Sequence, residues 1–344
     1  MTGPAHRPML AKVREEIPEG PGWRYEPKWD GFRAIVRHAG DALDIRSRDD
    51  RPFTRYYPEI ETLMLERGGP DYVLDGEIVV VRPEGFGFDE LLQRIHPAAS
   101  RVKTLSERWP ATFIAFDLLE RDGEDLRTRP LRERRSMLED LASALGAPLA
   151  PDDLAKLPVG PDLFLTPHTD DVAVTRRWWE DDAGIGQDGV VAKHADQPYL
   201  PGERGWVKVK HRKTVDVVVG GFRLQGEDAI GSLLLGLHDD EGTFHYLGHT
   251  SSFKAKEKRE IREILRPLEE GAPSFEGYRQ PGGQSRWSRG KTTEWVAVRP
   301  ELVCEVSYDR MQGMRFRHGT TFVRWRPDRR PETCTLDQVR PRES

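Results

Sequence analysis

The sequence is organised around one stretch, Glu26-Pro27-Lys28-Trp29-Asp30-Gly31-Phe32-Arg33, which follows a lead-in rich in proline and glycine and precedes an apolar segment. Lys28 is therefore expected at the rim of a sheet, with a glycine turn beside it. Partial burial and neighbouring positive charge would lower the pKa of its ammonium group and free the amine lone pair. Such an amine is able to attack the α-phosphate of a nucleoside triphosphate. The alternative is a solvated Lys28–Asp30 pair in a β-turn.

Short apolar segments surround this stretch in the first two thirds of the chain. The expected strands, rich in β-branched and aromatic residues, cover residues 32–36, 73–74, 77–81 and 112–116. Between them, residues 58–67 and 132–144 carry apolar side chains at three- and four-residue spacing, which is typical of amphipathic helices laid on a sheet. This part is therefore expected to mix helices and sheets.

The pattern changes after Lys213. Three closely spaced strands are expected, then a helix, then three more strands; they cover residues 215–224, 232–238, 243–249, 254–268, 295–298, 302–308 and 321–325. This order fits a small Greek-key β-barrel of the OB kind, a recurrent nucleic-acid-binding fold. The fold class is thus α+β, with a mixed domain at 1–212 followed by an OB-fold domain at 213–344.

Composition agrees with two soluble domains. The chain has 344 residues, of which 37% are hydrophobic and 32% charged. It contains no apolar run near the ~18 residues of a membrane span, and its first residues lack the apolar stretch of a signal peptide. A cytoplasmic location is expected. Cys304 and Cys334 have no metal-ligand spacing, so no role is assigned to them.

Charge is distributed unevenly. The net charge of −5 divides into −7 for residues 1–212 and +2 for residues 213–344. Residues 279–330 contain 12 basic and 5 acidic side chains, and six aromatic side chains lie between them. Basic residues mixed with aromatic ones suit a nucleic-acid backbone. The alternative is a solvated face with a few core aromatics.

Five further motifs follow Lys28 in order: Ser47-Arg48, Asp75-Gly76-Glu77, Ala115-Phe116-Asp117, Asp188-Gly189-Val190-Val191-Ala192-Lys193 and Trp206-Val207-Lys208-Val209-Lys210. Lys208 and Lys210, two residues apart on one strand, point the same way and are able to meet a phosphate together. The carboxylates of Glu77 and Asp188 are hard oxygen ligands suited to Mg²⁺ or Mn²⁺. Taken singly, each motif has a plain structural alternative, such as a core phenylalanine or a turn acid.

Taken together, these motifs resemble those of the covalent nucleotidyltransferase superfamily, which comprises ATP-dependent DNA ligases, RNA ligases and mRNA capping enzymes. The resemblance spans nearly the whole chain. It implies that residues 1–212 form an adenylation (nucleotidyltransferase) domain and that residues 213–344 form the OB-fold domain. It also implies ATP as cofactor, with Mg²⁺ or Mn²⁺, and Lys28 as the lysine that takes up AMP covalently.

The same resemblance implies roles for individual residues. The catalytic residues would be Lys28, Lys208 and Lys210. The nucleotide would be bound by Glu26, Lys28, Arg33, Arg48, Glu77, Phe116, Asp188, Lys208, Lys210 and Arg326. The metal would be held by Glu77 and Asp188, and nucleic acid would be bound by Arg33, Arg48, Arg204, Arg315 and Arg317. Phe116 is expected to offer an exposed ring to the purine, and Glu26 to accept a hydrogen bond from its amino group.

Arg326 belongs to the last motif, Arg324-Trp325-Arg326-Pro327-Asp328-Arg329, which in relatives swings over the nucleotide and contacts the outgoing pyrophosphate. Two positions depart from the family pattern. The fourth motif usually starts with glutamate, and here Asp188 is one methylene shorter. Only Gly205 separates Arg204 from Trp206, whereas many relatives have more residues there.

Within the superfamily, the compact layout, the opening 7–11 and residues 316–318 look most like small bacterial DNA ligases of the LigC/LigD type. These stand alone or are fused to polymerase modules in end joining. The resemblance implies sealing of 5′-phosphate/3′-hydroxyl nicks through lysyl-AMP, in DNA repair, recombination or end joining. Nicked double-stranded DNA is the expected partner, together with other repair or end-joining proteins. We expect a monomer, associated with the nucleoid and not with a membrane.

Three alternatives remain open at this point. An RNA ligase would use the same lysine chemistry on nicked RNA. A capping-type guanylyltransferase would accept GTP in place of ATP. A catalytically idle OB-fold binding protein would need none of the charged motif residues, and their presence argues against it.

Overall fold

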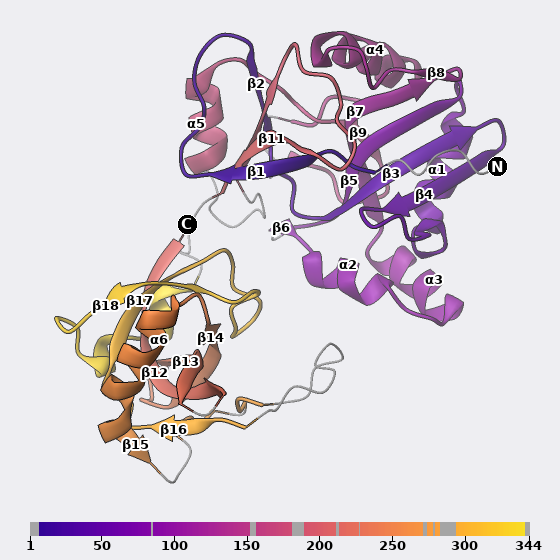
Figure 1. The fold of residues 1–344 in the computed structure, drawn as a ribbon. Coiled ribbons are helices and arrows are strands. Elements are labelled where there is room, and N and C mark those ends of the chain that lie inside the picture. Colours follow the sequence, from indigo (N-terminus) through magenta and orange to yellow (C-terminus); the bar gives the residue numbers. More distant parts are fainter. Residues whose placement is uncertain are drawn as a thin grey trace. The chain divides into compact units, whose positions relative to one another are not determined.

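The computed structural model describes residues 7–83, 85–151, 156–180, 189–210, 213–226, 228–270, 274–277, 279–282 and 294–340. The chain divides into two compact units, Met1–His211 and Arg212–Ser344 (Figure 1). Asp188 lies outside the described residues. No described helix has the length and apolar character needed to cross a membrane.

The first unit contains a seven-stranded sheet with the order β4-β3-β5-β7-β8, in which β6 also pairs with β5 and β9 with β7. Its strands are β3 (Phe32–Ala39), β4 (Ala42–Ser47), β5 (Tyr72–Arg82), β6 (Gly85–Phe86), β7 (Ala111–Arg121), β8 (Glu124–Asp125) and β9 (Leu163–Leu165). Nearly every residue of β5 and β7 is buried, which explains their continuous apolar sequences. These two long strands form the middle of the sheet.

A four-stranded sheet with the order β1-β11-β10-β2 completes the first unit. Its strands are β1 (Leu10–Arg14), β2 (Trp23–Pro27), β10 (Val190–His194) and β11 (Arg204–Val209). β1 runs parallel to β11, while β10 is antiparallel to both β11 and β2. One buried apolar cluster contains residues of both sheets, among them Met9, Phe116 and Trp206, so the two sheets pack against each other there.

Helices cover the outer faces of these sheets. The first unit contains η1 (Thr54–Tyr56), α1 (Pro58–Arg67), α2 (Phe88–Arg94), α3 (Ala99–Arg108), α4 (Leu131–Ala144) and α5 (Val172–Glu180). In Figure 1, α4 lies beside β7 and β9, and α5 lies beside β2, in agreement with their contacts. α1 has the predicted bounds, with a proline at its start, which suits that position because proline lacks an N–H.

The second unit is a β-barrel with a helix. Its strands are β12 (Lys213–Gln225), β13 (Ala229–His238), β14 (Phe244–Thr250), β15 (Glu269–Glu270), β16 (Val296–Val298), β17 (Val303–Tyr308) and β18 (Thr321–Trp325). The long strand β12 pairs with β17 through its first half and with β13 through its second. A parallel bridge between Thr250 and Thr320 joins the end of β14 to the start of β18 and closes the barrel.

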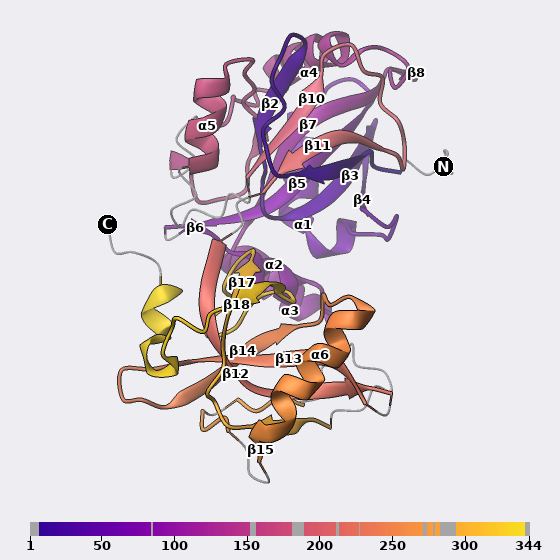
Figure 2. The same ribbon diagram turned by 60° about the vertical axis from the view of Figure 1, so that its left-hand side comes forward.

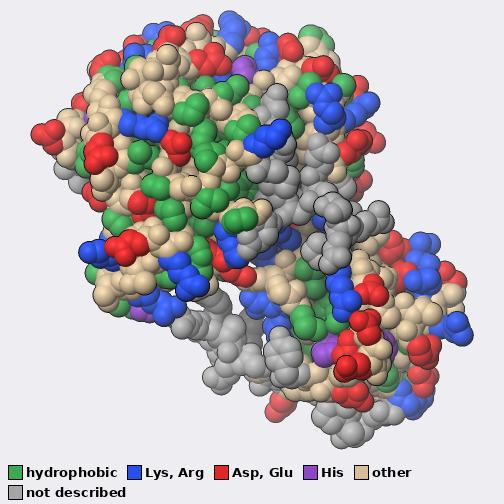
Figure 3. All heavy atoms as spheres, turned by 180° about the vertical axis from the view of Figure 1, so that it is seen from behind, with side chains coloured by type: hydrophobic (Ala, Val, Ile, Leu, Met, Phe, Trp, Pro, Cys, Tyr) green, Lys and Arg blue, Asp and Glu red, His purple; other side chains and the backbone are tan. Residues whose placement is uncertain are grey.

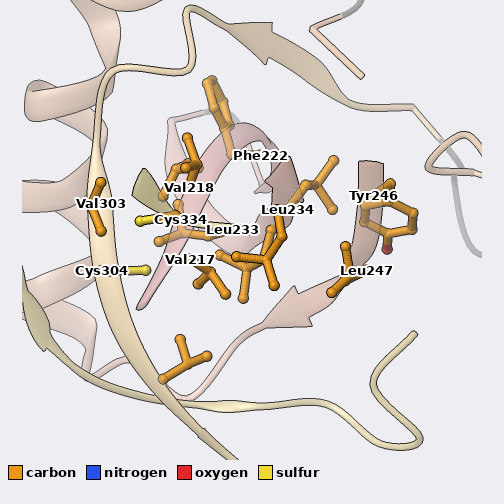
Figure 4. Close-up of a cluster of buried hydrophobic side chains, with 14 of the residues drawn as sticks. Val217, Val218, Phe222, Leu233, Leu234, Tyr246, Leu247, Val303, Cys304 and Cys334 are labelled. Atoms are coloured by element: carbon orange, nitrogen blue, oxygen red, sulfur yellow. The ribbon is translucent and has the colours of Figure 1, made fainter. Parts of the chain in front are cut away.

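The helix α6 (Ala255–Leu265) follows β14 and packs against β13 (Figure 2), and η3 (Arg266–Leu268), η4 (Pro331–Thr333) and η5 (Leu336–Gln338) complete the unit. Three strands, a helix and returning strands in a closed barrel are the OB arrangement, so the α+β expectation with an OB-fold second part is confirmed. The barrel core is apolar: Val217, Phe222 and Leu234 are fully buried, and Cys304 and Cys334 lie among them (Figure 4).

One expectation about the sheet was wrong. Residues 73–74 and 77–81 were expected as separate strands with Asp75-Gly76-Glu77 after the first, but β5 runs through all of them. The polar residues do not break the strand because Asp75 is held by partners inside the protein and Glu77 faces a pocket.

Candidate active site

One pocket of the first unit brings together nine of the predicted site residues. It has a volume of about 280 Å³, and these nine residues line it: Glu26, Lys28, Arg33, Arg48, Glu77, Phe116, Arg204, Lys208 and Lys210. Leu10, Ala11, Lys193 and Trp206 are among the other lining residues. The pocket lies where both sheets meet, so residues far apart in the sequence face one space.

Lys28 sits at the end of β2, where the backbone is tightly packed. Its N–H donates to the Gly189 carbonyl at 2.9 Å, which fixes the strand end beside the start of β10. Gly189 has φ +109°, and a Cβ there would collide with the Val209 carbonyl oxygen. A Cβ on Gly31 would likewise collide with the Ile78 carbonyl oxygen. These close approaches hold a half-buried Lys28 at the pocket rim, as expected from the glycine beside it.

Lys208 and Lys210 come from β11 and its end, and β10 separates this strand from β2 in the smaller sheet. They alternate along β11 and its end with Val207 and Val209, which are 5% and 1% exposed. The valines pack into an apolar cluster, whereas both lysines line the pocket. The side-chain period of two in a strand therefore puts both ammonium groups on the pocket side.

Glu77 adds a carboxylate whose ionisation is perturbed. Burial raises its pKa to about 7, and the positive charges of Lys28 and Arg33 partly oppose that effect. Because Lys28 acts on this pKa, its ammonium group and the Glu77 carboxylate are electrostatic neighbours. A carboxyl group that changes charge near neutral pH beside a lysine is a feature of functional sites more than of surfaces.

The aromatic wall differs from the expected open face. Phe116 is only 8% exposed, because β7 is covered on both sides and Trp206 packs edge-on against the ring at 6.0 Å between centroids. The expectation of an exposed ring was wrong, although Phe116 still lines the pocket. The ammonium of Lys193 lies 4.7 Å from the centre of this ring and 4.3 Å from that of Trp206.

Lys193 also meets the residue expected at the purine amino group. Its Nζ lies 2.7 Å from Glu26 Oε2 and donates to the Phe116 carbonyl at 3.1 Å. Glu26 is 4% exposed and Lys193 1%, so this is a buried ion pair among the residues that line the pocket. Burial raises the pKa of Glu26, and the Lys193 ammonium partly opposes the rise. Glu26 is thus already hydrogen-bonded by a protein group.

Positive charge is concentrated inside the pocket. Its lining contains seven lysine and arginine residues against the two carboxylates Glu26 and Glu77, although residues 1–212 carry a net charge of −7. On the face of the protein seen in Figure 3, basic and acidic side chains are interspersed. A basic, partly aromatic hollow in an acidic unit suits a ligand with several phosphates.

Four predicted residues lie outside the described part of the first unit. Asp188 is not among the described residues, and Arg315, Arg317 and Arg326 belong to the second unit. Arg326 is held there by Asp216 at 2.8 Å and by Asp328 at 2.8 Å. Arg315 is exposed and donates to Gln312, and Arg317 is half-buried.

Sequence reasoning missed several residues around the pocket. Lys193 and Trp206 were quoted within motifs without a role, yet both line the pocket. Lys193 had a visible signal, since a lysine within the apolar strand β10 is as unusual as Lys28. Asp75 accepts a hydrogen bond from Arg33, and Tyr199 donates one to Asp75. Neither residue had such a signal, because each is distant in sequence from its hydrogen-bond partner.

Comparison with known proteins gives two family matches. Residues 8–210 match the ATP dependent DNA ligase domain, and residues 226–329 match the ATP dependent DNA ligase C terminal region. The chain is 43% identical to DNA ligase C of Mycobacterium tuberculosis, over 98% of this chain and 94% of that protein. It is 31% identical to the multifunctional non-homologous end joining DNA repair protein LigD of the same species, over 90% of this chain and 37% of LigD.

A solved structure of a Lig E DNA ligase shares the fold. The TM-score is 0.55 at 18% identity, and the match covers 93% of this chain and 98% of the other. The matched region thus includes both units.

Proposed function

The chain belongs to the ATP-dependent DNA ligases, which join 5′-phosphate and 3′-hydroxyl ends at nicks through a lysyl-AMP intermediate, and we propose that Lys28 is the lysine that takes up AMP. The observation that supports this assignment most is the pocket itself, which Lys28 lines together with Lys208 and Lys210. Two ammonium groups in the same pocket as a third favour its neutral, nucleophilic form and attract a polyphosphate.

In the first step, the Lys28 amine attacks the α-phosphorus of ATP, the P–N bond forms, and pyrophosphate leaves as the P–O bond breaks. Lys208 and Lys210 stabilise the charge that grows on the α-phosphate oxygens. Phe116 packs against the adenine, with Glu26 and Lys193 at its edge. Arg326, brought from the second unit, meets the departing pyrophosphate, for which a forked guanidinium is well suited.

In the second step, AMP passes from Lys28 to the 5′-phosphate of a nick, which regenerates the amine. In the third, the 3′-hydroxyl displaces AMP and forms the phosphodiester bond. Both are in-line phosphoryl transfers, in which positioning and charge stabilisation supply most of the acceleration. Arg48 and Arg204 line the pocket and, with Arg33, Arg315 and Arg317, are proposed to contact the DNA backbone.

A divalent cation is part of the proposal, as Mg²⁺ or Mn²⁺. Among the described residues, no group of three or more histidine, cysteine or acidic side chains forms a metal cage. A cation carried by the triphosphate needs only one or two carboxylates, and Glu77 in the pocket fits that need, with Asp188 as a second candidate. Such an ion would neutralise charge on the phosphate oxygens.

Nicked double-stranded DNA is the proposed substrate, and repair or end joining the proposed setting. The match to LigD, whose name states non-homologous end joining, supports that setting. We propose a monomer that meets other repair proteins on DNA near the nucleoid.

A labelling gel tests the assignment of Lys28. The protein is incubated with α-labelled ATP and Mg²⁺ or Mn²⁺, and then chased with nicked duplex. We expect a labelled band that empties on adding DNA, that is absent in Lys28→Ala and Lys28→Arg, and that persists in Lys12→Ala, an exposed lysine on β1. A labelled Lys28→Arg protein would refute the assignment. GTP in place of ATP, and nicked RNA in place of nicked DNA, should both fail.

A further inference from the structure

Four hydrogen-bonded residues form a closed ring behind one wall of the pocket. Arg33 donates from Nε to Asp75 Oδ1 at 2.7 Å and from Nη2 to Asp75 Oδ2 at 2.5 Å. Tyr199 Oη donates to Asp75 Oδ2 at 2.6 Å and accepts from the Met9 N–H at 2.8 Å. The Met9 carbonyl accepts from Arg33 Nη2 at 3.0 Å, which closes the ring.

This ring joins the two sheets of the first unit. Arg33 and Asp75 lie on the neighbouring strands β3 and β5 of the larger sheet. Met9 directly precedes β1, and Tyr199 lies in the loop before β11, so both belong to the smaller sheet's side. Met9, Asp75 and Tyr199 are 0%, 0% and 2% exposed. Buried hydrogen bonds of this kind are strong and fix geometry, because no water competes for them.

The ring orients the one member that reaches the pocket. Of the four residues, Arg33 alone lines it, and its guanidinium carbon lies 4.8 Å from the centre of the Phe116 ring and 5.0 Å from that of Trp206. Its Nε and Nη2 are engaged by the ring, while Nη1 has no hydrogen-bond partner among the described residues. The ring therefore fixes the orientation of the guanidinium and leaves the two N–H groups of Nη1 unused by its own hydrogen bonds.

We propose that Tyr199 is a positioning residue for the ligase reaction: through Asp75 and Met9 it holds the Arg33 guanidinium in the orientation that meets the bound nucleotide. This rests on the proposed role of Arg33 in the nucleotide site. Without the Tyr199 hydroxyl, Asp75 Oδ2 loses one donor and the buried Met9 N–H loses its acceptor. The Asp75 carboxylate and the N-terminal segment are then free to shift, and Arg33 shifts with them.

The tyrosine hydroxyl is suited to this task across the working pH range. Burial raises the pKa of Tyr199 well above its usual value, and the nearby Asp75 charge adds to the effect. Tyr199 therefore keeps its proton and continues to donate to Asp75.

A double-mutant cycle on lysine adenylation tests the proposal in the full chain. The variants are Tyr199→Phe, Arg33→Ala and both together, and single-turnover labelling with α-labelled ATP is followed over a range of ATP concentrations. We expect Tyr199→Phe to slow adenylation about tenfold, the effect of losing a hydrogen bond to a charged group. In the Arg33→Ala background, Tyr199→Phe should lower the adenylation rate less than twofold.

The matched control is Tyr72→Phe, which removes the hydroxyl of another tyrosine that is 1% exposed and has no hydrogen-bond partner among the described residues. It should adenylate at the wild-type rate. Asp75→Asn, which has nearly the same shape as the wild type, is a second variant should Tyr199→Phe fold poorly. It should also slow adenylation in the wild-type background and have little effect in the Arg33→Ala background. Thermal unfolding of each variant identifies any loss of folded protein.

The results distinguish the positioning role of Tyr199 from the role of Arg33 in the nucleotide site. Equal fold-losses for Tyr199→Phe with and without Arg33 would overturn the positioning role, because a general weakening of the fold acts in both backgrounds. If Arg33→Ala adenylates at the wild-type rate, the assignment of Arg33 to the nucleotide site fails, and the inference fails with it. Lys28 labelling in the wild type is unaffected by either result.

Discussion

The two units of this ligase bury different kinds of side chain. In the first unit the buried residues include nine charged ones, and the list comprises Glu26, Asp30, Asp75, Glu90, Arg94, Asp117, Arg134, Arg135 and Lys193. Among the described residues of the second unit, the buried polar side chains are the hydroxyl residues Ser232, Thr250 and Thr320. Burying a charge costs free energy unless it is paired, and in the first unit buried pairs such as Arg134–Asp117 and Lys193–Glu26 meet that condition.

The difference teaches where the chemistry resides. The first unit combines apolar clusters with buried charges, two of which, Glu26 and Lys193, line the pocket, whereas the described core of the second unit is one apolar cluster. Removing a charge partner should therefore damage the first unit most, and removing apolar volume should damage the second.

The largest effect on stability is expected at the Arg134–Asp117 pair. Both side chains are 0% exposed, and Arg134 donates to Asp117 at 2.8 and 2.9 Å. Asp117→Asn leaves a buried guanidinium without its counter-charge and should cost about 3–5 kcal/mol. Urea unfolding measures the loss. The control is Asp125→Asn, which breaks the pair with Arg127 where Asp125 is 50% exposed and should cost below ~1 kcal/mol. Equal costs would contradict the claim that the buried charge pair stabilises the first unit more than an exposed pair does.

An apolar truncation in the barrel should come next. Leu234 is fully buried in the core of the second unit, and Leu234→Ala should cost about 2–5 kcal/mol through lost contacts and a cavity. The free energy of unfolding measures it, with Val323→Ala, where the side chain is 47% exposed, as a near-neutral control. A result in which both variants lose the same stability would contradict an apolar core as the main support of this unit.

The smallest effect concerns pH. The pKa of Glu77 is about 7 in the first unit, whereas hydrogen bonding to Arg326 lowers the pKa of Asp328 to about 2 in the second. Glu77 is protonated below about pH 7, and only its ionised form is able to hold a cation. The second-order rate constant for adenylation should therefore fall up to tenfold per pH unit below about 7.

Two variants assign this acidic limb. It should become less steep in Glu77→Gln, which is slow at every pH, and should keep its steepness in Asp328→Asn. An acidic limb equally steep in Glu77→Gln would assign the titration to a group other than Glu77.

Much of the fold was predictable because local patterns agree with it. The helix at 58–67 has the bounds expected from its periodicity, and strand β18 matches the predicted residues 321–325. Lys208 and Lys210 face one side because a strand has a period of two, whatever surrounds it.

What failed depends on the surroundings of a residue. Phe116 was expected to be exposed, and nothing in its own segment indicates that Trp206, 90 positions later, covers it. Tyr199 lies 124 residues from Asp75, its hydrogen-bond acceptor, so no local pattern indicates that pairing. Long-range packing decides such details, and single-sequence reasoning does not reach it.

The most direct test of the account locates the bond between protein and AMP. The wild-type protein is adenylated with ATP, digested under neutral conditions that preserve the phosphoramidate, and examined by tandem mass spectrometry. The account predicts AMP on the Nζ of Lys28, with Lys193, Lys208 and Lys210 unmodified. AMP found on any of those three lysines would contradict it.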